Sequence, residues 1–389
     1  MRAEEAARRV IHDAIAARTF PSAAVDLGDS AGPLWTDAFG TMTFDPASAA
    51  TSIDTPFDLA SLTKVIATTT VVMELVRTGT LRLDERVSSS FEDWRSADRE
   101  SVTIRDLLEH ASGLPARLID APPHTRREFE HDIGALPLEY APRSRSIYSD
   151  LGFILLGFLA ADRGGASLAE LFDRIAGPRR VRIPPSRNAS VDHRGPGGGG
   201  RPDRREIAVR LQADTASETL LTFDLPPDLR RLAAPTRPMD ADPRRGRLLV
   251  GDVHDNYAAA LGGVAGHAGL FGTAPATGAF ARAVLRASRG DLDGPPPFTP
   301  ALLAEFTAKS AVDQSSRALG WDTMLPTSSC GSGMSPRAFG HVGFTGTSIW
   351  IDPARDRYFV LLTNRVCDGG TIDEMRAVRR AFHDALSDV

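Results

Sequence analysis

Hydrophobic positions at the start of the chain follow first the period of a helix and then the alternation of strands. The helical positions recur at intervals of three and four residues: Ala7, Val10, Ile11, Ala14 and Ile15. That spacing predicts an amphipathic helix. Two strand-like stretches follow at 22–27 and 34–39, separated by the turn-forming sequence Gly-Asp-Ser-Ala-Gly at 28–32. The pattern therefore predicts a helix that leads into a β-hairpin.

A second helical stripe is longer and more apolar. The positions that share its face are Leu62, Val65, Ile66, Thr69, Val72, Met73 and Val76. We expect residues 58–61 to open this helix, and Gly79 lies where a helix C-cap belongs. Further helices are predicted at 103–110, 150–163 and 168–176.

Strand signals return in the last third of the chain. Three strands are predicted at 338–342, 347–352 and 357–364, followed by a terminal helix at 372–386. This order predicts an α+β fold, in which an antiparallel β-sheet is flanked by N- and C-terminal helices and interrupted by a mostly helical insertion.

The same order suggests two domains. We expect residues 1–58 and 255–389 to form the sheet domain, and residues 59–254 to form the helical domain. Within the latter, residues at about 178–205 are rich in arginine, glycine and proline. That composition predicts a flexible surface loop, with arginine binding to an anionic partner as the alternative.

Composition narrows the class of protein. The chain has 389 residues, 24% of them charged, and a formal net charge of -5, which is typical of a folded protein without an electrostatic preference for nucleic acid. Two cysteines are too few for a disulfide scaffold or a cysteine zinc site. The first residues lack a signal-peptide core, and the longest apolar run, at 151–161, is too short for membrane insertion. We expect a cytoplasmic protein, or an exported one if a leader was trimmed.

Lysine is rare in this chain, and one of the two lysines stands in a chemically suggestive place. In Ser61-Leu-Thr-Lys64 the two functional side chains are three residues apart, so a helix puts them on one face. Lys64 could take the proton of Ser61 if burial and nearby cations depress the pKa of its amine. The alternative is a serine near a helix start with a lysine whose stem only covers the surface.

Residues around this pair carry a family resemblance. Residues 57–64 (Phe-Asp-Leu-Ala-Ser-Leu-Thr-Lys) resemble the nucleophile motif of the β-lactamase and penicillin-binding-protein-like serine hydrolases, as residues 103–115 (ending His-Ala-Ser-Gly-Leu-Pro) resemble a segment that follows it. Tyr-Ser-Asp at 148–150 stands where those enzymes carry Tyr-x-Asn. His-Val-Gly at 341–343 stands where they carry Lys-Thr-Gly, or His-x-Gly in esterase-like branches. The resemblance covers about 20–364.

The resemblance implies a role for each matching residue. Ser61 would be the acylated nucleophile and Lys64 its proton acceptor, while Tyr148 would relay protons and His341 would stand in the third motif. The backbone N–H groups of Ser61 and Phe344 would form the oxyanion hole. No cofactor and no metal is implied. A shifted third motif, Phe-Thr-Gly at 344–346, is an alternative register.

Two departures from the family pattern bear on the substrate. His341 carries at most a partial charge at neutral pH where β-lactamases place a lysine that attracts a carboxylate. Asp150 can accept a hydrogen bond from Lys64 but, when ionised, cannot donate one to an acyl-amide carbonyl. Both changes weaken the case for efficient β-lactam hydrolysis. Asp150, Gly343 and Phe344 are expected to contact the substrate.

A second distinctive segment contains His254, Asp255 and His267 between clusters of glycine. These side chains fit no standard zinc spacing, so a metal is a weak hypothesis. A structural role in tight turns and contact with the substrate are the other two interpretations. The segment resembles a branch that includes exo-acting N-acetylmuramoyl-L-alanine amidases, which implies a pocket for a sugar or a stem peptide.

The leading hypothesis is therefore a serine hydrolase that forms a covalent acyl-enzyme with an amide or ester. Its expected partner is a small-molecule or muropeptide-like substrate, cleaved by an amidase or D-peptidase activity. A promiscuous carboxylesterase, an acyltransferase and a catalytically retired muropeptide-binding module are the alternatives. No oligomeric state is predicted.

Overall fold

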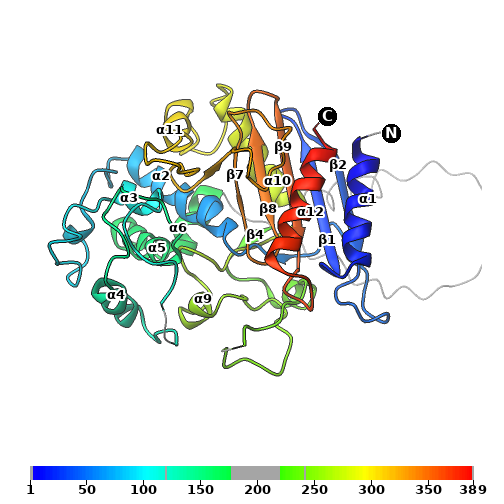
Figure 1. Ribbon diagram of the computed structural model, residues 1–389, viewed down its shortest axis with the longest axis horizontal. Coiled ribbons are helices and arrows are strands. Elements are labelled where there is room, and N and C mark those ends of the chain that lie inside the picture. Colours follow the sequence, from blue (N-terminus) through cyan, green and yellow to red (C-terminus); the bar gives the residue numbers. More distant parts are fainter. Residues whose placement is uncertain (1–2, 119–120, 177–219, 241, 388–389) are drawn as a thin grey trace, which may run out of the picture.

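The computed structural model describes residues 3–118, 121–176, 220–240 and 242–387. Its main sheet has six strands in the order β2-β1-β9-β8-β7-β6, and every neighbouring pair is antiparallel (Figure 1). The strands are β1 (Ser22–Gly28), β2 (Pro33–Gly40), β6 (Asp322–Thr323), β7 (Phe339–Val342), β8 (Ser348–Asp352) and β9 (Arg357–Thr363). The pairing of β1 with β9 joins the N-terminal hairpin to the C-terminal strands, so the two ends of the chain build one sheet.

Helices cover both faces of this sheet. The terminal helices α1 (Ala3–Ala16) and α12 (Ile372–Ala385) lie side by side on one face (Figure 1). Their apolar sides bury against aromatic residues of the strands, among them Trp350 and Phe359. Helix α10 (Ala274–Ser288) packs on β1, β8 and β9 from the opposite face. The predicted α+β architecture with flanking terminal helices is confirmed.

The region between the two parts of the sheet is largely helical. It contains a π-helical turn (Lys64–Thr69), α2 (Thr70–Arg77), a 3-10 turn (Val87–Ser89), α3 (Ile104–Leu108), α4 (Arg126–Ala135), α5 (Asp150–Gly164) and α6 (Leu168–Ala176). Helix α5 is buried on nearly all sides, which explains its continuous apolar run. No single helix in the described ranges is long and apolar enough to cross a membrane; α5 and α6 meet that test only as a pair bent by 72°.

Short elements connect the helical region to the main sheet. They are β3 (Phe57–Asp58), β4 (Leu221–Thr222), α8 (Pro227–Arg230), α9 (Asn256–Ala260), β5 (Phe271–Gly272) and α11 (Pro300–Phe306). The three strands among them form a second small sheet in the order β3-β5-β4. This sheet sets the segment before Ser61 beside the glycine-rich segment that ends at β5.

One predicted boundary is wrong. Residues 58–61 do not open the helix, because Asp58 belongs to β3 and pairs with Phe271. The helix begins only after Ser61, first as the π-helical turn and then as α2. The predicted cap is correct, since Gly79 has a φ of +72° directly after α2. The predicted loop at 178–205 lies outside the described residues, and the domain boundaries stay a prediction.

Candidate active site

Ser61 lies at a sharp bend between β3 and the π-helical turn. Ala60, the residue before it, has a φ of +47°, a left-handed conformation that a residue with a Cβ rarely adopts. The carboxylate of Asp58 accepts the N–H of Ala60 at 2.8 Å and that of His254 at 2.6 Å, and burial raises the pKa of Asp58 to about 6. The bend therefore holds a partly exposed Ser61 at the start of a helix under local backbone strain.

Lys64 lies one turn further on and is completely buried. Its Nζ donates to Ser61 Oγ at 3.1 Å, to Asp150 Oδ1 at 2.8 Å and to the carbonyl of His267 at 3.0 Å. An ammonium group has three protons, and each one has an acceptor here. The amine therefore has a single defined position against the hydroxyl of Ser61.

Tyr148 reaches the same hydroxyl from a different part of the chain. It precedes α5, whose N-cap Ser149 turns the backbone into the helix. The Oη of Tyr148 donates to Ser61 Oγ at 2.6 Å, and its ring centroid lies 4.8 Å from Lys64 Nζ. The structure thus brings together the three side chains that the motifs single out, on two elements that are 84 or more residues apart in the sequence.

The charge state of Lys64 differs from the sequence-based hypothesis. Burial is the largest single effect and lowers the pKa of this amine, but Asp150 at 2.8 Å and Tyr148 together outweigh burial and raise the pKa above its ordinary value of 10.5. Burial in turn opposes ionisation of Asp150, but Lys64, His267 and Arg117 together more than compensate for it, so the pKa of that carboxyl is lowered. The expected depressed pKa is therefore wrong: Lys64 is a cation at rest because the chain carries an aspartate beside it. Burial also raises the pKa of Tyr148, which keeps the phenol neutral.

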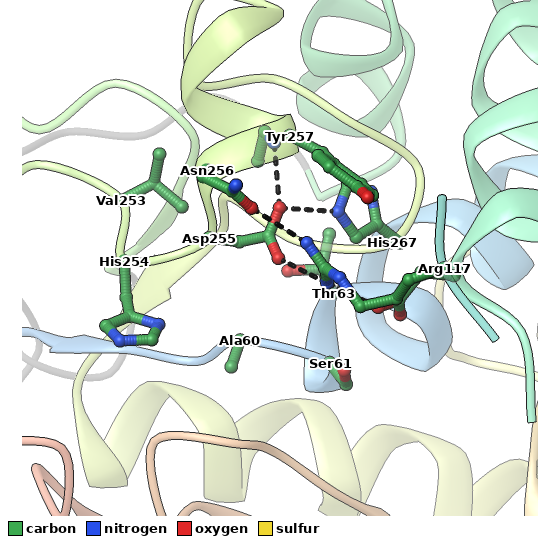
Figure 2. A network of polar contacts seen from close by, with 12 residues as sticks. Ala60, Ser61, Thr63, Arg117, Val253, His254, Asp255, Asn256, Tyr257 and His267 are labelled. Atoms are coloured by element: carbon green, nitrogen blue, oxygen red, sulfur yellow. Dashed lines mark hydrogen bonds and ion pairs between the residues drawn. The ribbon is translucent and has the colours of Figure 1, made fainter. Parts of the chain in front are cut away.

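A partly buried polar network joins Asp150 to Asp255 through Arg117, and Figure 2 shows the contacts of Asp255 with Arg117 and His267. Arg117 donates through Nη1 to Asp150 Oδ2 at 2.8 Å and to Asp255 Oδ2 at 2.9 Å, and through Nη2 to Asn256 Oδ1 at 2.8 Å. Asp255 also contacts His267 Nε2 at 2.7 Å. Although burial opposes it, His267 and Arg117 hold the pKa of Asp255 well below its usual range. Arg117 therefore ties two carboxylates together behind the lysine.

The histidines of the second distinctive segment have separate positions. The side chain of His267 is 1% exposed and faces Asp255, so it has no surface that a substrate could reach. His254 lies apart from this pair in Figure 2 and stacks on Phe344 with ring centroids 5.6 Å apart. Burial lowers the pKa of His254 to about 4, so it is neutral at pH 7. Within the described ranges no three His, Cys, Asp or Glu side chains are grouped to hold a metal ion.

The glycines of that segment agree with the structural interpretation, in which they allow tight backbone turns. Gly262, Gly263 and Gly269 have φ values of +77°, +91° and +118°. A Cβ on Gly266 would lie 1.9 Å from the carbonyl oxygen of Phe153 in α5. Only a glycine, which has no side chain, allows the loop to approach α5 this closely. The close approach brings the carbonyl of His267, the next residue, within reach of a hydrogen bond from Lys64.

The third motif lies at the end of β7, beside the strand that precedes Ser61. Thr345 and Thr347 donate through Oγ1 to the carbonyls of Asp58 and Leu59, at 2.8 and 3.1 Å. In the described part of the chain, neither the backbone N–H of Ser61 nor that of Phe344 has an acceptor. Two free donors on adjoining segments are what an oxyanion hole requires. Gly346, with a φ of +105°, belongs to the turn after the motif, so His-Val-Gly is the register that ends the strand.

His341 is neutral, and an arginine lies near it. Burial, with the charges of Arg317 and Lys64, holds the pKa of His341 well below its usual range. The guanidinium of Arg317 lies 5.2 Å from the ring centroid of Tyr148, and its Nη1 lies 3.9 Å from Asp322 Oδ2. Nothing in the sequence separates Arg317 or Arg117 from the other arginines, so no motif points to either of them.

Comparisons with known proteins agree with this geometry. The family model described as Beta-lactamase matches residues 7–381, and the chain therefore belongs to the β-lactamase family. It is 28% identical over 334 residues to an N-acetylmuramyl-L-alanine amidase of Bacillus subtilis (strain 168), covering 80% of this chain and 68% of the relative. It is 29% identical over 347 residues to an Escherichia coli (strain K12) protein named provisionally as a D-alanyl-D-alanine carboxypeptidase, covering 82% and 71%.

Solved structures share the fold across the whole chain. A D-alanine carboxypeptidase of Burkholderia cenocepacia has a TM-score of 0.66 at 16% identity, with 100% of this chain and 99% of that one covered. A β-lactamase/D-alanine carboxypeptidase of Pseudomonas syringae has a TM-score of 0.69 at 14% identity, with 98% of both chains covered. The chain is thus a member of a family of serine hydrolases, with the fold of that family.

Proposed function

We propose that this protein hydrolyses an amide or ester bond in small peptidoglycan-type fragments through an acyl-enzyme at Ser61. The observation that carries the proposal is the convergence of Lys64 Nζ and Tyr148 Oη on one serine oxygen, at 3.1 and 2.6 Å. The N–H groups of Ser61 and Phe344, which have no acceptor among the described residues, support it, because a tetrahedral intermediate needs donors for its negative oxygen.

The proton path of the proposed acylation follows from the charge of Lys64. A cationic amine can accept the proton of Ser61 only if it releases one of its own, and Asp150 Oδ1 at 2.8 Å is the acceptor. The bond from Ser61 Oγ to the substrate carbonyl carbon forms as this double transfer occurs. Tyr148 then donates its proton to the leaving group and regains one from Lys64. Asp150 finally returns its proton to Lys64, which restores the ion pair. Water reverses these steps to release the acid.

The choice of substrate class has two supports. The relatives named above as an amidase and a D-alanyl-D-alanine carboxypeptidase point to peptidoglycan chemistry. The guanidinium of Arg317 has no hydrogen-bond acceptor in the described part of the chain and lies beside Tyr148. A cation at this point favours a substrate that carries a carboxylate near its leaving group, as a C-terminal D-alanine does.

The test is labelling and turnover with a nucleophile variant. Ser61→Ala should lose reaction with a fluorophosphonate and should accumulate no acyl-enzyme by intact mass. Ser96→Ala, at an exposed serine, is the matched control and should react as the wild type does. Persistence of labelling in Ser61→Ala would refute the proposed nucleophile.

A substrate panel then separates the remaining activities. Wild-type enzyme should release product from an N-acetylmuramoyl-L-alanine peptide or from a peptide ending in D-alanyl-D-alanine faster than from a short-chain ester. The reverse order would favour a carboxylesterase. An added alcohol that captures most of the acyl group would favour a transferase, and binding of a muropeptide without any turnover would favour a binding module.

A further inference from the structure

The peptide unit between Gly343 and Phe344 has its two polar groups in very different surroundings. Its N–H, which belongs to Phe344, has no acceptor among the residues that the structure describes. Its carbonyl oxygen, which belongs to Gly343, accepts a hydrogen bond from Arg379 Nη2 at 2.7 Å and a longer one from the backbone N–H of Gly346 at 3.1 Å. The N–H and the C=O of a trans peptide point in opposite directions. A group that holds the carbonyl from one side therefore sets the direction of the N–H on the other.

Gly343 itself lies against the nucleophile segment. A Cβ on Gly343 would lie 2.8 Å from the carbonyl oxygen of Leu59 and 3.3 Å from the Cβ of Ala60. The hydrogen bonds from Thr345 and Thr347 to the carbonyls of the same segment keep the third motif and the nucleophile segment in contact. Arg379 approaches from α12, so the peptide is held between α12 and the bend before Ser61.

Arg379 is an unusual residue for this place. It lies on the buried face of α12 at 6% exposure, and it makes no ion pair with a carboxylate in the described ranges. Its guanidinium donates to two carbonyl oxygens, those of Gly343 and Thr347, at 2.7 and 2.9 Å. Burial lowers the pKa of Arg379 to about 9, so the group is still a cation at neutral pH.

A buried cation without a counter-charge is costly, and an apolar side chain would pack α12 against the sheet equally well. The free-energy cost of burying the guanidinium is explained if its charge contributes to catalysis. A hydrogen bond from a charged donor is about twice as strong as a neutral one, and it polarises the amide that accepts it. Polarisation makes the N–H at the other end of that amide a better donor to a negative oxygen.

We propose that Arg379 is a positioning residue of the oxyanion hole: its guanidinium holds and polarises the Gly343–Phe344 peptide so that the N–H of Phe344 points at the oxygen that becomes negative during acyl transfer. This inference rests on the proposed acyl transfer at Ser61. Arg365 serves a different peptide, because its Nη2 and Nε donate to the carbonyl of Phe344 at 2.6 and 3.2 Å.

The deciding experiment measures the carbonyl stretch of the acyl-enzyme. Full-length enzyme is acylated at Ser61 with a slowly hydrolysed aryl ester carrying a ¹³C carbonyl, and the infrared band of the Ser61 ester is recorded. Hydrogen bonds in an oxyanion hole lower this frequency. Arg379→Met should move the band to a higher frequency and reduce kcat about 10-fold to 100-fold with little change in KM, less than the factor of about 10²–10³ for loss of a donor itself.

Two further variants serve as controls for the role of Arg379. Arg376→Met, at an exposed arginine one turn earlier in α12, should leave both the band and kcat unchanged. Arg379→Gln keeps an N–H donor without the charge, so its band should lie between those of the wild type and Arg379→Met. If the methionine variant does not fold, the glutamine variant decides the question.

A wild-type band and kcat in a folded Arg379→Gln or Arg379→Met protein would overturn the role of Arg379 and leave the proposed function intact. Absence of any Ser61-dependent ester band in the wild type would instead overturn the proposed function. The two failures are therefore distinguishable in one set of spectra.

Discussion

Asp150→Asn tests how Lys64 handles its protons. The substitution keeps the size of the side chain and one acceptor oxygen for the amine, but it removes the charge that lies 2.8 Å from Lys64 Nζ. It also removes a charge 2.8 Å from Arg117. The completely buried Lys64 is left without a carboxylate partner, so its ammonium form loses the contact that opposes desolvation.

The sign of the effect on stability follows from the two pKa shifts. The pKa of Lys64 is raised above 10.5 on folding, so its contribution to stability is complete below that pH and is lost as pH rises through the folded-state pKa. The pKa of Asp150 is lowered below 3.8, so its contribution is complete above that pH and is lost as pH falls through the folded-state pKa. The ion pair therefore stabilises the wild type across the whole range between these values.

Removing one partner of a buried ion pair costs about 3–5 kcal/mol when the other stays charged. In Asp150→Asn, however, Lys64 can lower this cost by releasing its proton, since burial alone lowers the pKa of its amine. The loss of unfolding free energy should consequently be largest near pH 5 and smaller near pH 9.

The acylation rate of the variant, like its stability, should be reduced most at acidic pH. Wild-type acylation should persist at mildly acidic pH, because Asp150 stays ionised and accepts the proton that Lys64 releases. In the asparagine variant Lys64 must first be neutral, so acylation should rise with pH through the lowered pKa of the amine. Near pH 5 the variant should be slower by a factor of about 10²–10⁴, the usual contribution of a positioned acid or base.

The assay is the second-order rate of fluorophosphonate labelling between pH 4.5 and 9.5, with urea unfolding at the same pH values. Asp162→Asn, which removes a half-exposed partner of Arg126, is the matched control and should follow the wild-type profile. An Asp150→Asn profile that superimposes on the wild type, or exceeds it at pH 5, would refute the proton path through Asp150.

Three further substitutions test other parts of the site. Tyr148→Phe removes the 2.6 Å contact with Ser61 and should lower ester and amide turnover about 10²-fold to 10⁴-fold without loss of folding; unchanged turnover would contradict the relay. Arg317→Met should raise KM about 10-fold for a carboxylate-bearing substrate and leave the KM for a neutral ester unchanged, whereas equal effects on both values would argue against carboxylate recognition. Gly266→Ala would place a Cβ 1.9 Å from a backbone oxygen of Phe153 and should cost about 3 kcal/mol or more in urea unfolding; a wild-type midpoint would contradict the close packing.

The elements that were predicted correctly are those whose patterns are local. The terminal helices, the first hairpin and the last three strands each carry a complete apolar period or alternation, and the structure places them within a few residues of the predicted bounds. The failure at residues 58–61 has a definite cause. Asp58 pairs with Phe271 and accepts two backbone N–H groups, contacts with distant segments that no local pattern contains.

In the candidate site, too, local spacing predicted some contacts, and others required the folded structure. Ser61 and Lys64 are three residues apart, so their proximity follows from a single helical turn, and the motif at Tyr148 indicated the third member. The sequence also showed an aspartate at position 150 in place of the usual asparagine. It could not show that this aspartate contacts Lys64 at 2.8 Å, where the lysine is completely buried.

The amino-acid sequence by itself determined the fold class, the order of the motifs and the identity of the chemical groups, because these depend on spacing along the chain. Only the tertiary structure decided which charges face one another. Arg117 reaches Asp255 across 138 positions, and Arg379 reaches Gly343 from the last helix. Protonation depends on burial and on the nearest opposite charge, and both are properties of the folded chain.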